Sequence, residues 1–292
     1  MIKKGIIVAA GSGSRLAPLS NSLSKHLFPV YDKPMIFYSL SILLLAKIKN
    51  ISLVTRNKDI NLYKSIFGNG EKFGFNLQYV IQDKPKGIAD ALKKNIDFIN
   101  YDPVCVVLGD NVIYGNTLAS NLISLTKKTN KSHIFGYYVK NPKDYGIVNF
   151  DKNNNIISLE EKPKKPKSNW AVPGIYFYDK TLIKKLGKIK PSKRKELEIT
   201  DVNKLYLKEK KLDLTLLGRG YAWLDMGTYD SIQEANNFIS AIERRQGLKI
   251  GCIEEICYNN GWISNENMKY FVKKYKGTNY GEYLNTIINK YK

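Results

Sequence analysis

The sequence predicts an α/β protein with a Rossmann-like, three-layer architecture: a mixed, mostly parallel sheet flanked by helices, with a small helical appendage at the C-terminus. Short apolar runs of strand length recur in the first third of the chain, at 4–9, 51–55, 77–81 and 104–108. Segments of helical length separate them, at 34–46 and 87–99. Buried strands that alternate with helices are typical of a parallel sheet covered on both faces.

The first elements follow from local patterns. The strand at 4–9 runs directly into a Gly/Ser-rich loop. The segment 34–46 is apolar, and Pro34 suits the first turn of a helix, where its missing N–H has no intrahelical partner to lose. The segment 87–99 predicts an amphipathic helix because its apolar residues fall on one face, namely Ile88, Leu92, Ile96 and Ile99.

The middle of the chain changes character. The turn sequence Asp151-Lys-Asn-Asn-Asn separates two of several closely spaced strand candidates, at 133–139, 146–151, 156–160 and 174–178. These strands would add mixed pairings to the parallel sheet. Helices follow at 198–208 and 228–245, the second with Thr228 as its N-cap and Gly247 just beyond its end.

Composition excludes several classes of protein. The 292 residues are 43% hydrophobic and 25% charged, which is ordinary for a globular protein. The first apolar run breaks at Gly11, and the apolar run at 42–46 is far shorter than the roughly 18 residues of a membrane span. We expect a cytoplasmic protein without a membrane partner. Three cysteines without a CxxC pair and two histidines make a zinc site unexpected.

The net charge of +21 bears on the partners of the chain. Most of the basic residues are lysines, and they are spread over nearly every segment. A protein that reads specific nucleic-acid sequences more often clusters its basic residues and uses arginine for bidentate contacts with bases. We therefore interpret the charge as a solvated surface and expect no nucleic-acid partner. Attraction of phosphorylated small molecules is compatible with it.

A glycine-rich loop, Gly11-Ser-Gly13-Ser-Arg15-Leu16, follows the first strand. A dinucleotide fingerprint would need glycine in place of Leu16, and the Gly-Lys-Ser/Thr of a Walker A loop is absent. The loop remains a glycine-rich turn whose backbone N–H groups can face an anion, with Arg15 and Lys25 as nearby cations. Taken alone, the motif fits an ordinary strand–helix turn equally well.

Acidic residues mark two further positions. Asp110 follows the apolar run 104–108, at the edge where open α/β sheets bind ligands, and Asp225 follows the aromatic-rich segment 221–224. Mg²⁺ is usually held by one or two carboxylates together with phosphate oxygens, so both acids are candidate ligands. Each could instead cap a turn. The run Glu160-Glu161-Lys162-Pro163 could bind sugar hydroxyls and a phosphate, although alone it fits a solvated charged turn better.

These motifs occur together, in an order that resembles the glucose-1-phosphate thymidylyltransferases within the sugar nucleotidyltransferase family. The resemblance runs from Lys4 to about Tyr283. It is carried by the stretches GIIVAAGSGSRLAPL, LSKHLFPVYDKPMIFYSLSILLLA, YVIQDKPKGIADAL, VLGDNVIYG, NPKDYGIVNFD, ISLEEKPKKPKSNWAVPGIYFYD, ELEITDVNKLYL, GRGYAWLDMGTYDSIQEANNFI and ERRQGLKI.

The resemblance implies Mg²⁺-assisted transfer of a nucleotidyl group from dTTP, or from UTP, to α-D-glucose 1-phosphate. It implies a catalytic domain over 1–228, with a nucleotide half at about 1–115 and a sugar half at about 116–228, and a helical region at 229–292. The implied catalytic cations are Arg15, Lys25 and Lys162, and the implied metal ligands are Asp110 and Asp225. The implied nucleotide-binding residues are Ala10, Gly11, Gly13, Ser14, Arg15, Gln82, Gly87 and Asp110. The implied sugar-binding residues are Tyr145, Gly146, Glu161, Lys162, Val172, Arg194 and Trp223.

The resemblance also implies a homotetramer and a first step toward dTDP-sugars such as dTDP-rhamnose. It implies feedback inhibition by a deoxy-sugar nucleotide at a second site, formed by Tyr114, Gly115, Gly218, Arg219 and Glu255. One departure affects nucleotide preference, because Asp90 stands where the family usually has an amide or glutamate. The alternatives are a relative that uses UTP or another sugar phosphate, and a catalytically silent binding module.

Overall fold

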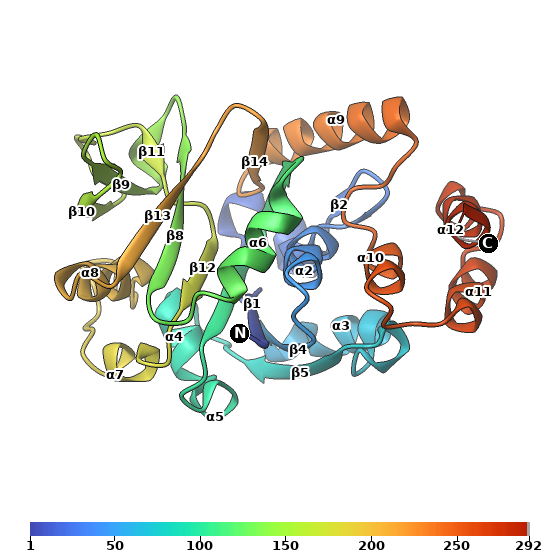
Figure 1. Cartoon of the computed structure of the whole chain (residues 1–292), viewed down its shortest axis with the longest axis horizontal. Helices are drawn as coiled ribbons and strands as arrows, with labels where there is room; N and C mark the ends of the chain where they lie inside the picture. The colour runs from blue at the N-terminus through green and yellow to red at the C-terminus, as the bar shows by residue number, and fades with distance from the viewer. Residues whose placement is uncertain (291–292) are drawn as a thin grey trace.

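The protein, described here by a computed structural model over residues 1–290, is built around one large twisted sheet (Figure 1). One half of this sheet is entirely parallel. Its strands lie side by side in the order β5 (Asn76–Ile81), β4 (Asn50–Thr55), β1 (Lys4–Val8) and β6 (Val104–Leu108). All four lie where the apolar runs predicted them, to within a residue at either end.

The other half of the sheet is mixed. The strand β12 (Ile175–Tyr178) pairs antiparallel with β6 and with β8 (Ser132–Tyr138), and joins the two halves. The sheet continues beyond β8 with β13 (Leu212–Leu217), which is parallel to β8, and with β11 (Trp170–Ala171), β9 (Gly146–Phe150) and β10 (Ile156–Glu161). The predicted α/β class, with a mixed sheet flanked by helices, is confirmed.

Two hydrophobic cores cover the two faces of the sheet, because neighbouring residues of a strand point to opposite sides. Ile7 and Val107 face a core that includes side chains of α2 (Ile36–Leu45), α3 (Ile60–Phe67) and α6 (Leu118–Thr126). Ile6 and Val106 face a core that includes side chains of α4 (Ile88–Lys93), α7 (Leu182–Leu186) and α8 (Ile199–Lys208). The three-layer arrangement follows from this alternation.

Two helices differ from the prediction, one in where it begins and the other in being interrupted. The helix expected from Pro34 begins at Ile36, because Pro34 belongs to a small hairpin of β2 (Pro29–Val30) and β3 (Lys33–Pro34). The helix expected over 87–99 is interrupted between α4 and α5 (Ile96–Ile99). At the interruption, the Asn95 side chain donates to the Ala91 carbonyl and accepts from the Ser52 hydroxyl of β4. A side chain that bonds locally in this way competes with the helical ladder.

A two-stranded ribbon stands apart from the large sheet. Its strands, β7 (Asn111–Gly115) and β14 (Tyr221–Asp225), run antiparallel with Asn111 opposite Asp225. The first of these strands was not predicted. The pairing brings Asp110, which precedes β7, next to Asp225, and the Met226 N–H donates to the Asp110 carbonyl over 3.0 Å.

The C-terminal region is helical, as predicted. The helix α9 (Tyr229–Gln246) begins with a capping box formed by Thr228 and Ser231, and Gly247 ends it in a left-handed conformation. Three helices follow: α10 (Ile253–Asn259), α11 (Asn265–Lys274) and α12 (Asn279–Lys290). Ile253 and Cys257 of α10 belong to the same core as α2, so these helices share the core of the α/β region. The division of the chain at residues 115 and 228 stays a prediction.

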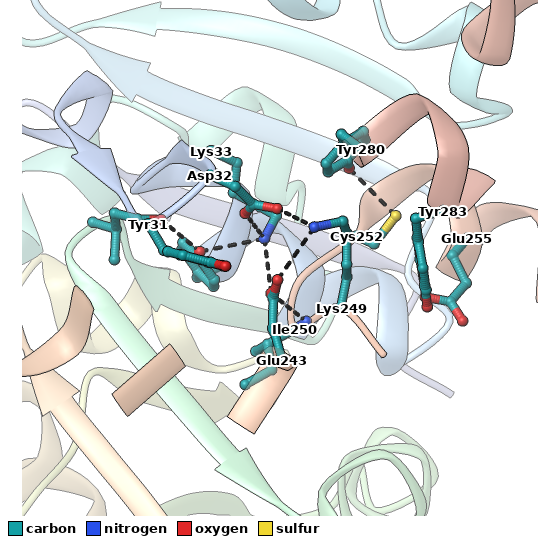
Figure 2. A network of polar contacts seen from close by, with 12 residues as sticks. Tyr31, Asp32, Lys33, Glu243, Lys249, Ile250, Cys252, Glu255, Tyr280 and Tyr283 are labelled. Carbon is teal, nitrogen blue, oxygen red and sulfur yellow. Dashed lines mark hydrogen bonds and ion pairs between the residues drawn. The ribbon is translucent and has the colours of Figure 1, made fainter. Parts of the chain in front are cut away.

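A buried network of charges ties α9 and the segment after it to the β2–β3 hairpin (Figure 2). The Lys33 ammonium donates to Glu243 over 3.1 Å and also pairs with Asp32, while Lys249 pairs with the same two acids. The Ile250 N–H adds a third donor to Glu243, over 2.8 Å. Lys33 and Glu243 are both buried, and each has a second partner of opposite charge, so the network compensates both charges within the fold.

Within residues 1–290, no helix is both long enough and apolar enough to cross a membrane. The three cysteines are free and buried.

His133 of β8 gives the fold a pH-dependent contribution to stability. Burial lowers the pKa of His133 from its ordinary value of 6.5 to about 4, and its Nε2 atom lies 2.8 Å from the Thr215 hydroxyl. The unfolded chain takes up a proton at about pH 6.5, whereas the folded chain does not until about pH 4. The contribution of the neutral imidazole is therefore present above pH 6.5 and is lost as the pH falls from 6.5 to 4.

We predict that His133→Gln flattens this dependence. The free energy of unfolding of the original protein, minus that of the variant, should fall by up to about 1.4 kcal/mol per pH unit below pH 6.5. Glutamine retains a polar partner for Thr215, and denaturant titrations at pH 7.5, 6.5 and 5.5 measure the difference. A difference that does not change with pH would contradict the assigned role of His133.

Candidate active site

One cleft, with a cavity volume of about 370 Å³, opens at the carboxyl ends of β1 and β6. Its walls contain every residue that the resemblance implies for the nucleotide, the sugar and the metal. These are Ala10, Gly11, Gly13, Ser14, Arg15, Lys25, Gln82, Gly87, Asp110, Tyr145, Gly146, Glu161, Lys162, Val172, Arg194, Trp223 and Asp225. The structure thus brings together residues that are far apart in the sequence, while the role of each stays a prediction.

The glycine-rich loop lines the cleft. Gly13 has a left-handed φ of 65°, and a Cβ atom there would lie 3.2 Å from Ser20 Cβ and 3.3 Å from Lys25 Cβ. A side chain at this position would be strained and crowded. A 3-10 turn, Ser14–Leu16, follows and carries Arg15 toward the β7–β14 ribbon. Its Nη2 atom lies 2.7 Å from the place that a Cβ atom of Gly227 would occupy.

Lys25 and Asp110 form an ion pair inside the cleft. Lys25 lies in the 3-10 turn Lys25–Leu27, and its ammonium donates to Asp110 Oδ2. The other carboxylate oxygen accepts from the Asn111 side chain over 2.9 Å. Burial by itself would raise the pKa of Asp110, but the Lys25 charge and these donors hold it below its ordinary value. Asp110 is therefore an ionised carboxylate at neutral pH.

Asp225 lies at the end of β14, beside the same group of charges. Burial and the negative charge of Asp110 raise its pKa, while Lys25, Arg15 and Lys162 oppose the rise. The two acids are thus close enough to repel one another, and a cation between them would relieve the repulsion. Within residues 1–290 no group of three or more His, Cys, Asp or Glu side chains is placed to hold a metal ion. Two carboxylates completed by substrate oxygens suit Mg²⁺.

Asn111 links the Asp110 end of the cleft to Trp223, and sequence reasoning missed it. Its side-chain oxygen accepts from Trp223 Nε1 over 2.6 Å and from the Gly174 N–H over 3.1 Å, while its nitrogen donates to Asp110. Trp223 in turn contacts the Tyr145 ring, with 5.1 Å between centroids. The only available signal was its position directly after Asp110, because its partners lie on distant segments.

At another part of the cleft, Glu161 at the end of β10 accepts from the Thr200 hydroxyl of α8 and from Arg194 Nη2, the latter over 3.2 Å. Arg194 also donates to Glu198 through Nε and Nη2, over 3.1 and 2.8 Å. Neither Thr200 nor Glu198 was predicted, although both are buried and line the cleft. The arrangement offers carboxylate acceptors to sugar hydroxyls beside a guanidinium.

Lys162 follows β10 directly and has a left-handed backbone, with φ of 44°. A residue other than glycine rarely adopts this conformation, and such residues concentrate at functional sites. The Lys162 N–H is held by the Tyr145 carbonyl over 3.0 Å. Lys162 thus joins Arg15 and Lys25 as a third cation whose charge acts on Asp225.

A group of buried side chains packs next to the glycine-rich loop and Lys25. His26 is buried, its Nδ1 atom lies 3.1 Å from the Ser24 hydroxyl, and that hydroxyl lies 3.0 Å from the Tyr63 hydroxyl. Burial and the neighbouring Lys25 charge lower the pKa of His26 to about 3, so the ring is neutral. A Cβ atom on Gly109 would lie 2.7 Å from His26 Cδ2, which explains glycine before Asp110.

The residues implied for a second site lie outside this cleft. Tyr114 and Gly115 end β7, and Gly115 pairs with Tyr221, whose N–H donates to the Gly218 carbonyl over 3.0 Å. Arg219 follows Gly218 in the turn that leads into β14. Glu255 is separate from this turn, on α10, and accepts from the Tyr283 hydroxyl over 2.7 Å (Figure 2).

Comparisons with known proteins agree with the geometry. The nucleotidyl transferase family matches residues 4–242. A glucose-1-phosphate thymidylyltransferase of Neisseria meningitidis serogroup A is 44% identical over 98% of this chain and 100% of its own length. A protein of the same name from Mycobacterium tuberculosis is 43% identical over 98% and 99%.

Solved structures are similar to the chain as well. A Bacillus anthracis protein in complex with sucrose is similar with a TM-score of 0.74 and 39% identity, over 80% of this chain and 94% of that one. A UDP-glucose pyrophosphorylase in complex with UDP-glucose has a TM-score of 0.74 at 24% identity, over 84% and 100%, and shares the fold. The family match covers most of the chain, including the whole cleft, and the chain is therefore a member of the nucleotidyl transferase family.

Proposed function

We propose that the chain transfers the nucleotidyl group of dTTP to α-D-glucose 1-phosphate, which releases pyrophosphate and yields dTDP-glucose. The observation that carries the proposal is the meeting of three cations, Arg15, Lys25 and Lys162, with two acids in one cleft. The relatives that share this chain over nearly its full length bear the name of that enzyme. A binding module without activity would have no need for this arrangement of charges.

The reaction needs no general base. A sugar 1-phosphate is already anionic near neutral pH, so one of its oxygens can attack the α-phosphorus directly. The new oxygen–phosphorus bond forms as the bond from the α-phosphorus to the bridging oxygen breaks, and pyrophosphate leaves with that oxygen. The obstacle is repulsion between two polyanions, so catalysis consists of positioning and charge stabilisation.

Each cation has a place in this scheme. Arg15, on the glycine-rich loop, would hold the leaving pyrophosphate. Lys25 would bridge the reacting phosphates, and Lys162 would hold the phosphate of the sugar. Glu161 and Arg194 hydrogen-bond to one another and line the cleft, and they would orient the hydroxyl groups of the sugar ring.

A divalent metal ion would supply further positive charge for the triphosphate, and we propose Mg²⁺ bound by Asp110 and Asp225. The repulsion between these acids, together with their oxygen-only donor set, supports this assignment. We further infer a cytoplasmic homotetramer whose product feeds the synthesis of dTDP-sugars such as dTDP-rhamnose, as the resemblance implies.

A test of the reaction measures pyrophosphate release with glucose 1-phosphate and dTTP, and with UTP for comparison. We predict release only when both substrates and Mg²⁺ are present. Asp225→Ala should fold normally and lose kcat by about 10²-fold or more, because it removes half of the protein's donors to the ion. The exposed acid Asp230 offers a matched control, and Asp230→Ala should retain turnover.

Two results would count against this account. Turnover at the original rate in a folded Asp225→Ala variant would remove Asp225 from the metal site. The absence of pyrophosphate release with every nucleotide and sugar phosphate would instead favour a binding module.

Regulation can be tested separately. We propose that a deoxy-sugar nucleotide binds away from the cleft at Tyr114, Gly115, Gly218 and Arg219, whereas Glu255, which the resemblance also implies, lies on the separate helix α10. Arg219→Ala should therefore weaken inhibition by dTDP-rhamnose about tenfold, with little change in uninhibited kcat, because it removes a cation from the second site. Inhibition that is purely competitive with dTTP, and equal in both proteins, would refute a second site.

A further inference from the structure

The side-chain amide of Gln82 is held in one orientation at the nucleotide end of the cleft. Gln82 follows β5 directly, is only 3% exposed and lines the cleft. Its backbone N–H donates to the Thr55 carbonyl over 2.9 Å. Its side-chain nitrogen, Nε2, donates to the Gly87 carbonyl over 3.1 Å and to Asp90 Oδ2 over 2.7 Å.

These two bonds use both hydrogens of the amide group. A carbonyl and a carboxylate can only accept, so a flipped amide would set its oxygen against two acceptors and lose both bonds. The observed orientation is therefore the one that the chemistry allows. It leaves Oε1 as the atom available to a ligand, and no residue within 1–290 donates a hydrogen bond to this oxygen.

The two acceptors are themselves fixed. Asp90 lies in the first turn of α4, and Gly87 precedes that helix. The Leu197 segment holds this turn, because Ala89 N–H donates to the Leu197 carbonyl over 3.2 Å and Leu197 N–H donates to the Lys86 carbonyl over 2.7 Å. A Cβ atom on Gly87 would lie only 2.4 Å from the Leu197 oxygen, and φ there is 97°. The orientation of Gln82 thus depends on a helix start that is hydrogen-bonded on both sides of Gly87.

We propose that Asp90 is a specificity-determining positioning residue: by fixing the Gln82 amide, it makes the cleft accept bases that present a ring N–H donor. Thymine and uracil present such a donor at N3. Cytosine presents an acceptor at N3, which would face the lone pairs of Oε1. This role rests on the proposed nucleotide site. It also gives a reason for the aspartate at position 90, where the family usually has an amide or glutamate.

An amide at position 90 would remove the constraint. In Asp90→Asn, the new side chain can donate to Oε1 of a flipped Gln82, which then turns its own N–H toward the base. Gly87 continues to favour the original orientation, so both orientations become accessible and discrimination weakens without being reversed. Asp97→Asn is the matched control, because it makes the same chemical change at an exposed residue of the neighbouring helix α5.

The experiment measures kcat/KM for dTTP, UTP and dCTP with glucose 1-phosphate in the three proteins, and the dissociation constants of dTTP and dCTP without sugar. The original protein should favour dTTP and UTP over dCTP by about 10²-fold or more. Asp90→Asn should lower the dTTP-to-dCTP ratio about tenfold in both measurements, whereas Asp97→Asn should leave it unchanged. If Asp90 had a purely structural role, Asp90→Asn would lower kcat/KM and binding affinity by the same factor for dTTP and dCTP.

A ratio in folded Asp90→Asn that stays within twofold of the original would overturn the proposal, as would equal binding of dTTP and dCTP by the original protein. A binding ratio that falls as expected, in a protein that releases no pyrophosphate, would keep the role of Asp90 and refute the proposed reaction. The two proposals can therefore fail separately.

Discussion

Repulsion between two carboxylates is the constraint around which the cleft is organised. The antiparallel pairing of β7 with β14 sets Asn111 opposite Asp225 and so brings Asp110 and Asp225 together. Burial and the charge of Asp110 raise the pKa of Asp225. The cations Lys25, Arg15 and Lys162 oppose this rise only in part, so the pKa stays above its ordinary value. These side chains come from distant parts of the chain, yet they converge here because each follows a strand or loop at the same edge of the sheet.

The neutral groups of the cleft keep this arrangement in place. Asn111 hydrogen-bonds to Asp110 and Trp223 at once, so the position of the acid depends on the position of the tryptophan. His26 fills the space beneath Gly109 and remains uncharged, which avoids a further charge beside Lys25. At the other end, Gln82 is oriented by acceptors that α4 carries. In the proposed function, the charges would attract the phosphates and the oriented neutral groups would position the base and the sugar.

Local signals predicted much of this protein. The apolar runs indicated the four parallel strands. The glycine-rich loop and Asp110 line the cleft at the carboxyl ends of such strands, which is where sequence reasoning expected a ligand site. The capping residues Thr228 and Gly247 were correct because caps are local. Residues with non-local partners were missed: Asn111 bonds Trp223, which is 112 positions away, and Thr200 bonds Glu161, which is 39 positions away. The interruption at Asn95 depends on Ser52 of another strand, so helical periodicity alone could not show it.

The most direct test is a crystal structure of the protein with Mn²⁺, in place of Mg²⁺, and dTTP, with anomalous scattering used to locate the ion. The account predicts an Mn²⁺ peak between the carboxylates of Asp110 and Asp225, within bonding distance of both and of a phosphate oxygen. It also predicts the triphosphate along the glycine-rich loop. An ion bound away from both acids, or a triphosphate outside the cleft, would contradict the central claim that these two acids share one metal ion at the reacting phosphates.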